Sequence, residues 1–259
     1  MTFLNPRIRV RPARLEEKQA VVDIFYSAFG NDVMNRLMFP AGPTPSGKEK
    51  FGDRTFAELE PGKGELMVLV AEYFSPETHP TFDPDTYPDD GSGELVAFAK
   101  WIFQKDPRPE EEWKADEFVY TVETSGEGCD LDVMNAFLGD INRKQRDSAR
   151  GEPAAYLHIL ACRPDRQRIG AGSALVKFGI DLADSLNLPC RLEASPVGYS
   201  VYKRLGFKDV DVQDLNVTER WGVKRGADEY WGHNNALELA GPVPEGAQRT
   251  VIMRRPPKA

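Results

Sequence analysis

Short runs of apolar and β-branched residues recur along the chain, and their lengths are typical of strands. Leu66 to Tyr73 is almost continuously apolar, as expected for a strand that is buried on both faces of a sheet. Ile8 to Arg11 instead alternates apolar and polar residues before Pro12 interrupts the pattern. In chain order, the predicted strands are residues 8–11, 66–73, 94–103, 155–162, 189–194, 207–212 and 250–254.

Apolar residues that are three or four positions apart predict helices between these strands. From residue 16 to 29 this spacing is regular, and Gly30 then supplies a stop. A strong helix is also predicted from Gly172 to Leu186, closed by Asn187. The predicted helices are residues 16–29, 33–39, 48–59, 131–150, 172–186 and 197–205.

Strands and helices therefore alternate around one central sheet, which favours an α/β fold. No linker divides the chain, so we expect a single domain over residues 1–259 that carries three polar insertions. The insertions are residues 75–93, 104–130 and 213–248. In the second, the aromatic residues Trp113, Phe118 and Tyr120 are expected to anchor the segment over apolar surface. The structure of the third does not follow from its pattern.

Composition and charge exclude several classes of protein. The formal net charge of −8 provides no global attraction for nucleic acid, although it would attract cationic amines or simply aid solubility. No segment has the roughly 20 apolar residues of a membrane span, and the N-terminus lacks a secretory signal, so we expect no membrane association. Three widely spaced cysteines and three histidines predict neither disulfides nor a metal site. The expected location is the cytoplasm.

The most informative segment is a strand that leads through glycines into a helix. After residues 156–162 comes the turn Arg163-Pro164-Asp165, then Arg166-Gln167-Arg168-Ile169-Gly170-Ala171-Gly172, and a helix follows at once. The first amides of a helix have no intrahelical acceptor and favour an anion. Gly170 and Gly172 allow a phosphate close to the backbone, and Arg166 and Arg168 add positive charge.

This loop is similar to the Q/R-x-x-G-x-G/A signature of the GCN5-related N-acetyltransferase (GNAT) superfamily. About thirty residues later, Tyr202-Lys203-Arg204-Leu205-Gly206-Phe207 resembles the Y-x-x-x-G-F element of the same superfamily. The resemblance is close over residues 155–212 and diffuse elsewhere. Residues 192–199 also resemble a fungal branch of the superfamily.

The resemblance implies a mixed, mostly antiparallel twisted sheet of about seven strands, flanked by helices. A bulge splays two neighbouring strands into a V-shaped slot for acetyl-CoA. Main chain of residues 160–162 would pair with the pantetheine arm, and backbone N–H groups of residues 168–173 would hold the pyrophosphate. The implied cofactor contacts are Leu160, Ala161, Cys162, Arg166, Gln167, Arg168, Ile169, Gly170, Ala171, Gly172, Ser173, Ser195 and Tyr199.

Direct acetyl transfer needs a base for the amine and an acid for the departing thiolate. Tyr202 occupies the position of the acid in the family, or else packs beside Leu205. Strand alternation places His158 on one face with Tyr156, Leu160 and Cys162, so His158 is a candidate base or a core histidine. Glu193 is the competing base, directly or through water. Because transfer in the family is usually direct, Cys162 is interpreted as a core residue rather than a nucleophile.

The acceptor is less well specified than the donor. The favoured hypothesis is a small primary amine, because acceptor pockets in the superfamily come from variable segments such as 75–93 and 106–130. A protein N-terminus or lysine, and a non-catalytic acyl-CoA-binding module, are the alternatives. No metal and no nucleic-acid partner are expected, and the chain is expected to be a monomer or a homodimer.

Overall fold

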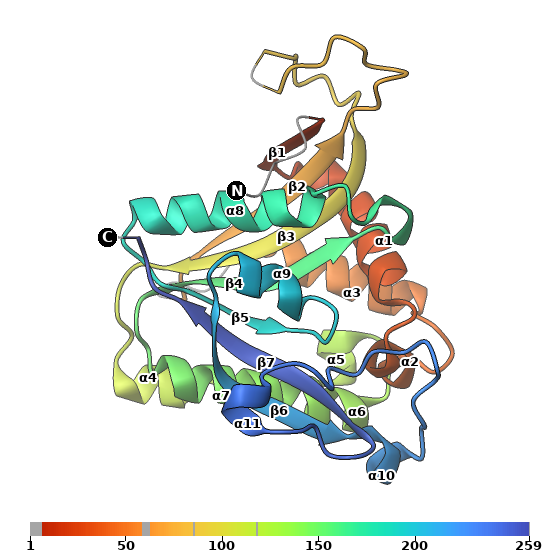
Figure 1. The fold of residues 1–259 in the computed structure, drawn as a ribbon, viewed down its shortest axis with the longest axis vertical. Helices are drawn as coiled ribbons and strands as arrows, with labels where there is room; N and C mark the ends of the chain where they lie inside the picture. Colours follow the sequence, from red (N-terminus) through yellow and green to blue (C-terminus); the bar gives the residue numbers. More distant parts are fainter. Residues whose placement is uncertain (1–6, 59–62, 85, 118, 259) are drawn as a thin grey trace.

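The computed structural model describes residues 7–58, 63–84, 86–117 and 119–258. Within these ranges, seven strands form one sheet in the order β1-β2-β3-β4-β5-β7-β6 (Figure 1). Neighbouring strands pair antiparallel except β4 and β5, which are parallel. The strands are β1 (Ile8–Pro12), β2 (Glu65–Tyr73), β3 (Glu94–Gln104), β4 (Ala154–Cys162), β5 (Cys190–Ala194), β6 (Lys208–Asn216) and β7 (Ala247–Arg255). The predicted mixed, mostly antiparallel sheet is confirmed, and β6 and β7 are longer than predicted.

The longer helices agree with the apolar spacing, with local differences at their ends. They are α1 (Lys18–Phe29), preceded by the 3-10 turn η1 (Leu15–Glu17), α2 (Val33–Met38), α3 (Pro45–Phe56), α8 (Ala171–Ser185) and α9 (Tyr199–Arg204). Helix α3 begins three residues before the predicted start, because the Thr44 side chain accepts a hydrogen bond from the Gly47 N–H and proline occupies the first turn. Its predicted end at Leu59 lies outside the described residues.

The sheet is covered on both faces. Successive residues of β2 and β3 belong alternately to two buried clusters, as the pleat requires. Leu69 and Trp101 belong to the cluster that includes α8, whereas Val70 and Phe98 pack with α1 and α3. The approach of α8 is close, because a Cβ added at Gly179 would lie 2.1 Å from the Trp101 ring. Helix α8 therefore lies on the face opposite α1 and α3 (Figure 1).

The predicted helix at residues 131–150 is interrupted. Asp130 caps α6 (Leu131–Met134) by accepting a hydrogen bond from the Val133 N–H. A π-helical turn, η2 (Asn135–Gly139), then joins α6 to α7 (Asp140–Ala149). Such wide turns are rare, and they occur frequently at functional sites.

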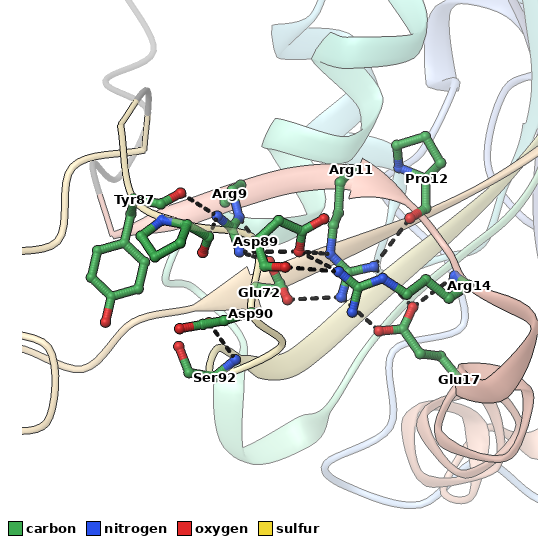
Figure 2. A network of polar contacts seen from close by, with 11 residues as sticks. Arg9, Arg11, Pro12, Arg14, Glu17, Glu72, Tyr87, Asp89, Asp90 and Ser92 are labelled. Carbon is green, nitrogen blue, oxygen red and sulfur yellow. Dashed lines mark hydrogen bonds and ion pairs between the residues drawn. The ribbon is translucent and has the colours of Figure 1, made fainter.

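The insertion at residues 75–93 is fastened to the edge of the sheet. Glu72 is fully buried between Arg9 and Arg11, at 2.8 and 2.7 Å, and Arg11 also pairs with Glu17. Asp89 of the insertion lies beside the same arginines, 3.5 Å from each (Figure 2). The Phe74 and Phe82 rings stack with centroids 3.9 Å apart. Polar and aromatic contacts together hold this insertion against β1 and β2.

The other two insertions contain short helices. Residues 104–130 form α4 (Glu110–Lys114) and α5 (Val122–Ser125), and residues 213–248 contain α10 (Val217–Trp221) and α11 (Leu237–Ala240). Tyr120 packs with α2 and α6, as expected for an anchor. Trp113 is half-buried, and Phe118 lies outside the described residues. Among the helices of the described ranges, none is both long and apolar enough to cross a bilayer.

Candidate active site

Strands β4 and β5 separate after a short paired stretch. Their parallel pairing covers only residues 155–157 of β4, opposite residues 190–192 of β5. Beyond this point β4 continues to Cys162 along β3, whereas β5 continues to Ala194 along β7. Leu160, Ala161 and Cys162 therefore present one backbone edge that pairs with no strand of the described chain. An extended ligand could hydrogen bond to this edge as an additional strand would.

A β-bulge at His158 changes which side chains share a face. Lys100 pairs with Ile159, but the next residue, Trp101, pairs with Leu157, so His158 has no partner across the ladder. The predicted common face of residues 156, 158, 160 and 162 is therefore wrong. Tyr156 and His158 line a cavity on the α1 side, with ring centroids 5.5 Å apart. Leu160 and Cys162 instead pack toward Gly172 of α8. An extra residue in one strand interrupts the period-two alternation on which the prediction relied.

The loop before α8 has the geometry of an anion site. After the 3-10 turn η3 (Pro164–Arg166), Arg168 and Gly170 both have positive φ, at 64° and 93°. Gly170 is the N-cap of α8, and its carbonyl accepts the first helical hydrogen bond, from Ala174. The earlier amides therefore lack helical acceptors. The N–H of Gly172 is directed toward the Cys162 sulfur.

The positive charge around this loop is partly compensated. Arg166 and Arg163 both pair with Glu94 at the start of β3, at 3.0 and 2.8 Å. Arg168 is exposed, as is Gln167, whereas Ile169 packs against the core. The side chains that were predicted to attract phosphate thus differ in their availability, and Arg166 is engaged by Glu94.

A cavity of about 280 Å³ lies on the α1 side of the sheet and reaches the gap between β4 and β5. Aromatic and apolar side chains of α1, α2, α3 and the α6–η2–α7 segment line it on one side, and residues of β3, β4, β5 and β7 line it on the other. Tyr120 and Ser125 contribute from the second insertion, whereas no residue among the described part of 75–93 lines it. Of the two segments that were expected to build the acceptor pocket, one contributes and the other does not.

Glu193 and Tyr202 lie on this cavity together. The Tyr156 hydroxyl donates a hydrogen bond of 2.6 Å to Oε2 of Glu193, while the buried Oε1 has no partner among the described residues. Burial raises the pKa of Glu193 to about 7, and the hydrogen bond from Tyr156 opposes this rise. At neutral pH the carboxylate can therefore both accept and release a proton.

Tyr202 is buried on α9, with its ring 5.9 Å from that of Phe207. Burial raises the pKa of Tyr202 well above its usual value, and the nearby Cys162 and Glu193 act in the same direction. The phenol therefore stays protonated over the ordinary pH range. A protonated hydroxyl and a carboxylate that line the same cavity are suited to paired proton transfers.

The two remaining candidates in β4 are poorly suited to proton transfer or attack. His158 is accessible from the cavity. Even so, desolvation of its ring, together with the positive charges of Lys100 and Arg54, lowers its pKa to about 3. Its imidazole is neutral and weakly basic at pH 7. Burial raises the pKa of the Cys162 thiol to about 11, which disfavours the thiolate that a nucleophile requires.

Ser195 and Tyr199 occupy different environments. Ser195 follows β5 and lines the cavity, and its hydroxyl accepts a hydrogen bond from the Gly198 N–H at 3.3 Å. The hydroxyl of Tyr199 instead donates to Asp209 of β6 at 2.8 Å. Tyr199 is therefore turned away from the cavity and toward the neighbouring strand.

Several polar residues of the cavity were not among the predicted site residues, and Arg54, Lys100 and Tyr156 bear most directly on its chemistry. Lys100 did carry a signal, because it is the one charged residue within the apolar run 95–103, and a lysine is rarely buried. Tyr156 and Arg54 had none, since their position depends on the packing of distant elements. In the described part of the chain, no group of three or more potential ligands is arranged to hold a metal ion.

Comparison with known proteins places this geometry in context. The sequence profile described as the acetyltransferase (GNAT) family matches residues 72–207, more than half of the 259 residues. A Schizosaccharomyces pombe protein described as an uncharacterized N-acetyltransferase is 33% identical over 60 residues. That match covers 23% of this chain and about a quarter (26%) of the yeast protein.

Two solved structures resemble the fold over nearly its whole length. The polyamine N-acetyltransferase of Drosophila melanogaster, which forms N-acetylagmatine, is 13% identical with a TM-score of 0.57, covering 96% of this chain and 99% of that one. Arylalkylamine N-acetyltransferase 2 of Aedes aegypti is 11% identical with a TM-score of 0.57, covering 97% and 99%. At these identities the similarity is one of fold alone.

Proposed function

Because the chain belongs to the acetyltransferase (GNAT) family, we propose that it transfers the acetyl group of acetyl-CoA directly to a primary amine of a small molecule. The observation that carries this proposal is the position of Glu193. Its carboxylate has a pKa of about 7 and lines a cavity that reaches the splayed strands β4 and β5. A base with this pKa is well matched to deprotonating an amine near neutral pH.

The donor would bind where the backbone is available. The unpaired edge of residues 160–162 suits the amides of a pantetheine arm, and the amides at the start of α8, which have no helical acceptor, suit a pyrophosphate. Gly172 supports the close approach of this helix, because a Cβ there would lie 3.1 Å from the Cys162 sulfur. Acetyl-CoA supplies the activated thioester.

In the proposed reaction, the neutral form of the amine attacks, and Glu193 accepts, directly or through water, the one proton that the nitrogen loses as it becomes an amide. The amine nitrogen forms a bond to the thioester carbonyl carbon, and the carbon–sulfur bond breaks. Tyr202 gives its proton to the departing sulfur, which leaves as the free thiol. The proton held by Glu193 then restores Tyr202 through solvent, so the products are an N-acetylated amine and CoA. His158 acts in this scheme as a neutral wall of the cavity.

The size and the lining of the cavity support a small acceptor over a protein substrate. Its walls come from α1, α3, α6, α7 and the second insertion, and its volume of about 280 Å³ suits a compact molecule. We also propose that residues 1–259 act as one catalytic domain. A non-catalytic acyl-CoA-binding module remains the alternative of a different class.

Release of free thiol from acetyl-CoA tests the proposal. The wild-type protein is incubated with a panel of small primary amines and, separately, with peptides that carry free N-termini and lysines. We expect thiol release with one or more small amines and little with the peptides. Tight CoA binding without turnover of any acceptor would instead indicate a binding module, and faster turnover of peptides would indicate a protein acetyltransferase.

A further inference from the structure

Two cationic side chains, Lys100 and Arg54, line the cavity at a distance from Glu193. Lys100 lies on β3 between Val68 and Ile159 of the neighbouring strands, and it is only 6% exposed. Its ammonium group donates a hydrogen bond of 2.7 Å to the main-chain oxygen of Arg54. Arg54, on α3, directs its accessible side chain to the same cavity. In the described ranges, no carboxylate forms an ion pair with either cation.

A buried cation that has no counter-ion is energetically costly. The carboxylates that line the cavity are Asp32 and Glu193, and both are engaged elsewhere. Asp32 caps α2 by accepting hydrogen bonds from Met34 and Asn35, and Glu193 is held by Tyr156. Burial, together with the charge of Arg54, lowers the pKa of Lys100 to about 8, so it is still mainly protonated at pH 7. The cavity thus contains positive charge that the protein itself does not neutralise.

The charges are separated along the cavity. Lys100 is on β3 and Glu193 is on β5, which are two strand spacings apart, or roughly 10 Å at about 4.8 Å per spacing. Between them lie β4, with Tyr156 and His158, and the apolar walls contributed by the helices. His158 is neutral here because desolvation of its ring, reinforced by the charges of the same two cations, lowers its pKa. A ligand that spans the cavity would therefore meet a proton acceptor at one end and two cations at the other.

We propose that the acceptor is an amine whose far end carries an oxyanion, such as a carboxylate or phosphonate, which Lys100 and Arg54 bind while the amine faces Glu193. This inference rests on the proposed acetyl transfer, whose acceptor it specifies. The separation of the charges requires an alkyl or aryl spacer, so an ordinary α-amino acid is too short. The local field opposes the preference for polycations that the net charge of −8 suggests.

A chain-length series tests this preference directly. Thiol release from acetyl-CoA is measured with 6-aminohexanoate, 8-aminooctanoate, the corresponding amides, an aminoalkyl phosphonate and 1,6-diaminohexane. We expect kcat/KM for a carboxylate or phosphonate to exceed that for the matched amide by about tenfold or more. The carboxylate and phosphonate arms distinguish the two oxyanions. Equal rates for acid and amide, or a preference for the diamine, would overturn the proposal.

Variants assign the preference to the two cations. In Lys100→Met and Arg54→Gln we expect the acid-to-amide ratio of kcat/KM to fall toward one. Lys105→Met is the matched control, because Lys105 follows the same strand but pairs with Glu65 at the surface. In that variant the ratio stays at the wild-type value. An unchanged ratio in both Lys100→Met and Arg54→Gln, with folding verified by thermal melting, would contradict the assignment.

A binding measurement separates this inference from the acetyl-transfer proposal. 4-Methylbenzoate has the oxyanion and the spacer but no amine, so calorimetry reports its binding whether or not any amine is acetylated. We expect it to bind wild-type protein and to bind Lys100→Met at least about fivefold more weakly. If 4-methylbenzoate binds the wild-type protein but not the variant, and no amine is acetylated, only the proposed reaction is contradicted. Equal binding to both proteins would contradict the proposed oxyanion site.

Discussion

The loop before α8 and the cavity beneath α1 belong to one candidate site, yet the loop presents backbone groups and the cavity presents side chains. The loop offers backbone amides whose direction is set by the positive φ of Gly170 and by the start of the helix. The cavity offers side chains from several helices and four strands, and their chemistry depends on burial. A backbone site binds the same group whatever the neighbouring side chains are, whereas a side-chain site changes with each substitution. We therefore expect substitutions in the cavity to change the chemistry and substitutions in the loop to change donor affinity.

The largest expected effect is on the cavity side, at Glu193. Glu193→Gln keeps the shape and can still accept the Tyr156 hydrogen bond, but it cannot take a proton from the amine. We expect kcat to fall by about 10²- to 10⁴-fold with little change in the KM for acetyl-CoA. Glu238→Gln, on the exposed helix α11, is the control and keeps the wild-type rate. A loss of less than about threefold in steady-state kcat would remove Glu193 from the reaction.

The next effect is expected at Tyr202, where the two sides meet. Tyr202→Phe keeps the packing against Phe207 and removes the proton donor for the departing sulfur. We expect kcat to fall by about 10²-fold, the lower end for general acid catalysis. A donor with a more acidic thiol leaving group should recover part of this loss. Tyr87→Phe, in the insertion outside the cavity, serves as the control. No recovery with the better leaving group would argue against an acid role.

On the loop side the expected effect is smaller and concerns affinity. In Gly172→Ala the new Cβ would lie 3.1 Å from the Cys162 sulfur, so the Cys162 side chain or α8 must move by a few tenths of an ångström. We expect this to cost about 1 kcal/mol of acetyl-CoA affinity, or roughly fivefold in Kd measured by calorimetry. Cys162→Ala removes the sulfur, so the double variant should recover most of the affinity. A double variant no better than Gly172→Ala would show that the sulfur contact is not the cause.

The smallest expected effect is that of substituting His158. The dependence of kcat/KM on pH shows whether His158 or Glu193 is the base. Because the pKa of Glu193 is about 7, kcat/KM should rise as pH increases through 7 and then level off. A His158 base, with its pKa near 3, would give a flat profile from pH 6 to 9. We expect His158→Ala to lower the rate by less than about fivefold and to leave the profile in place.

Substituting Tyr156, the hydrogen-bond partner of Glu193, should shift the pH dependence of kcat/KM. The Tyr156 hydrogen bond lowers the pKa of Glu193 against the effect of burial. Tyr156→Phe should therefore raise that pKa and shift the rising limb to higher pH, so that activity lost at pH 7 returns above pH 8. An unshifted limb would mean that another group titrates.

The contrast between the backbone groups of the loop and the side chains of the cavity also explains how much of this site the sequence predicts. The strand, the glycine loop and α8 are contiguous, so residues 155–186 could be interpreted together. The bulge at His158 depends on pairing with β3 and carries no local signal, and it moved Leu160 and Cys162 to the other face. The cavity gathers residues from position 25 to position 250, so its lining could not be read from any one segment. His158, Glu193 and Tyr202 were predicted and do line it. Lys100, isolated in an apolar run, carried a signal that the prediction did not use.

The π-helical turn η2 (Asn135–Gly139) offers a route by which related chains could diverge. Such a turn holds one residue more than an α-helix needs, and here Phe137 and Leu138 both line the cavity. Deleting one residue would restore α-helical spacing within the turn, while the helices on either side keep their faces, because the wide turn absorbs the extra residue. One of the two positions held by Phe137 and Leu138 would then be lost from the wall, whereas Ile141 and Asn142 of α7 would stay. A single codon gained or lost at this turn could thus exchange one acceptor for another across a lineage, while the donor loop stayed unaltered.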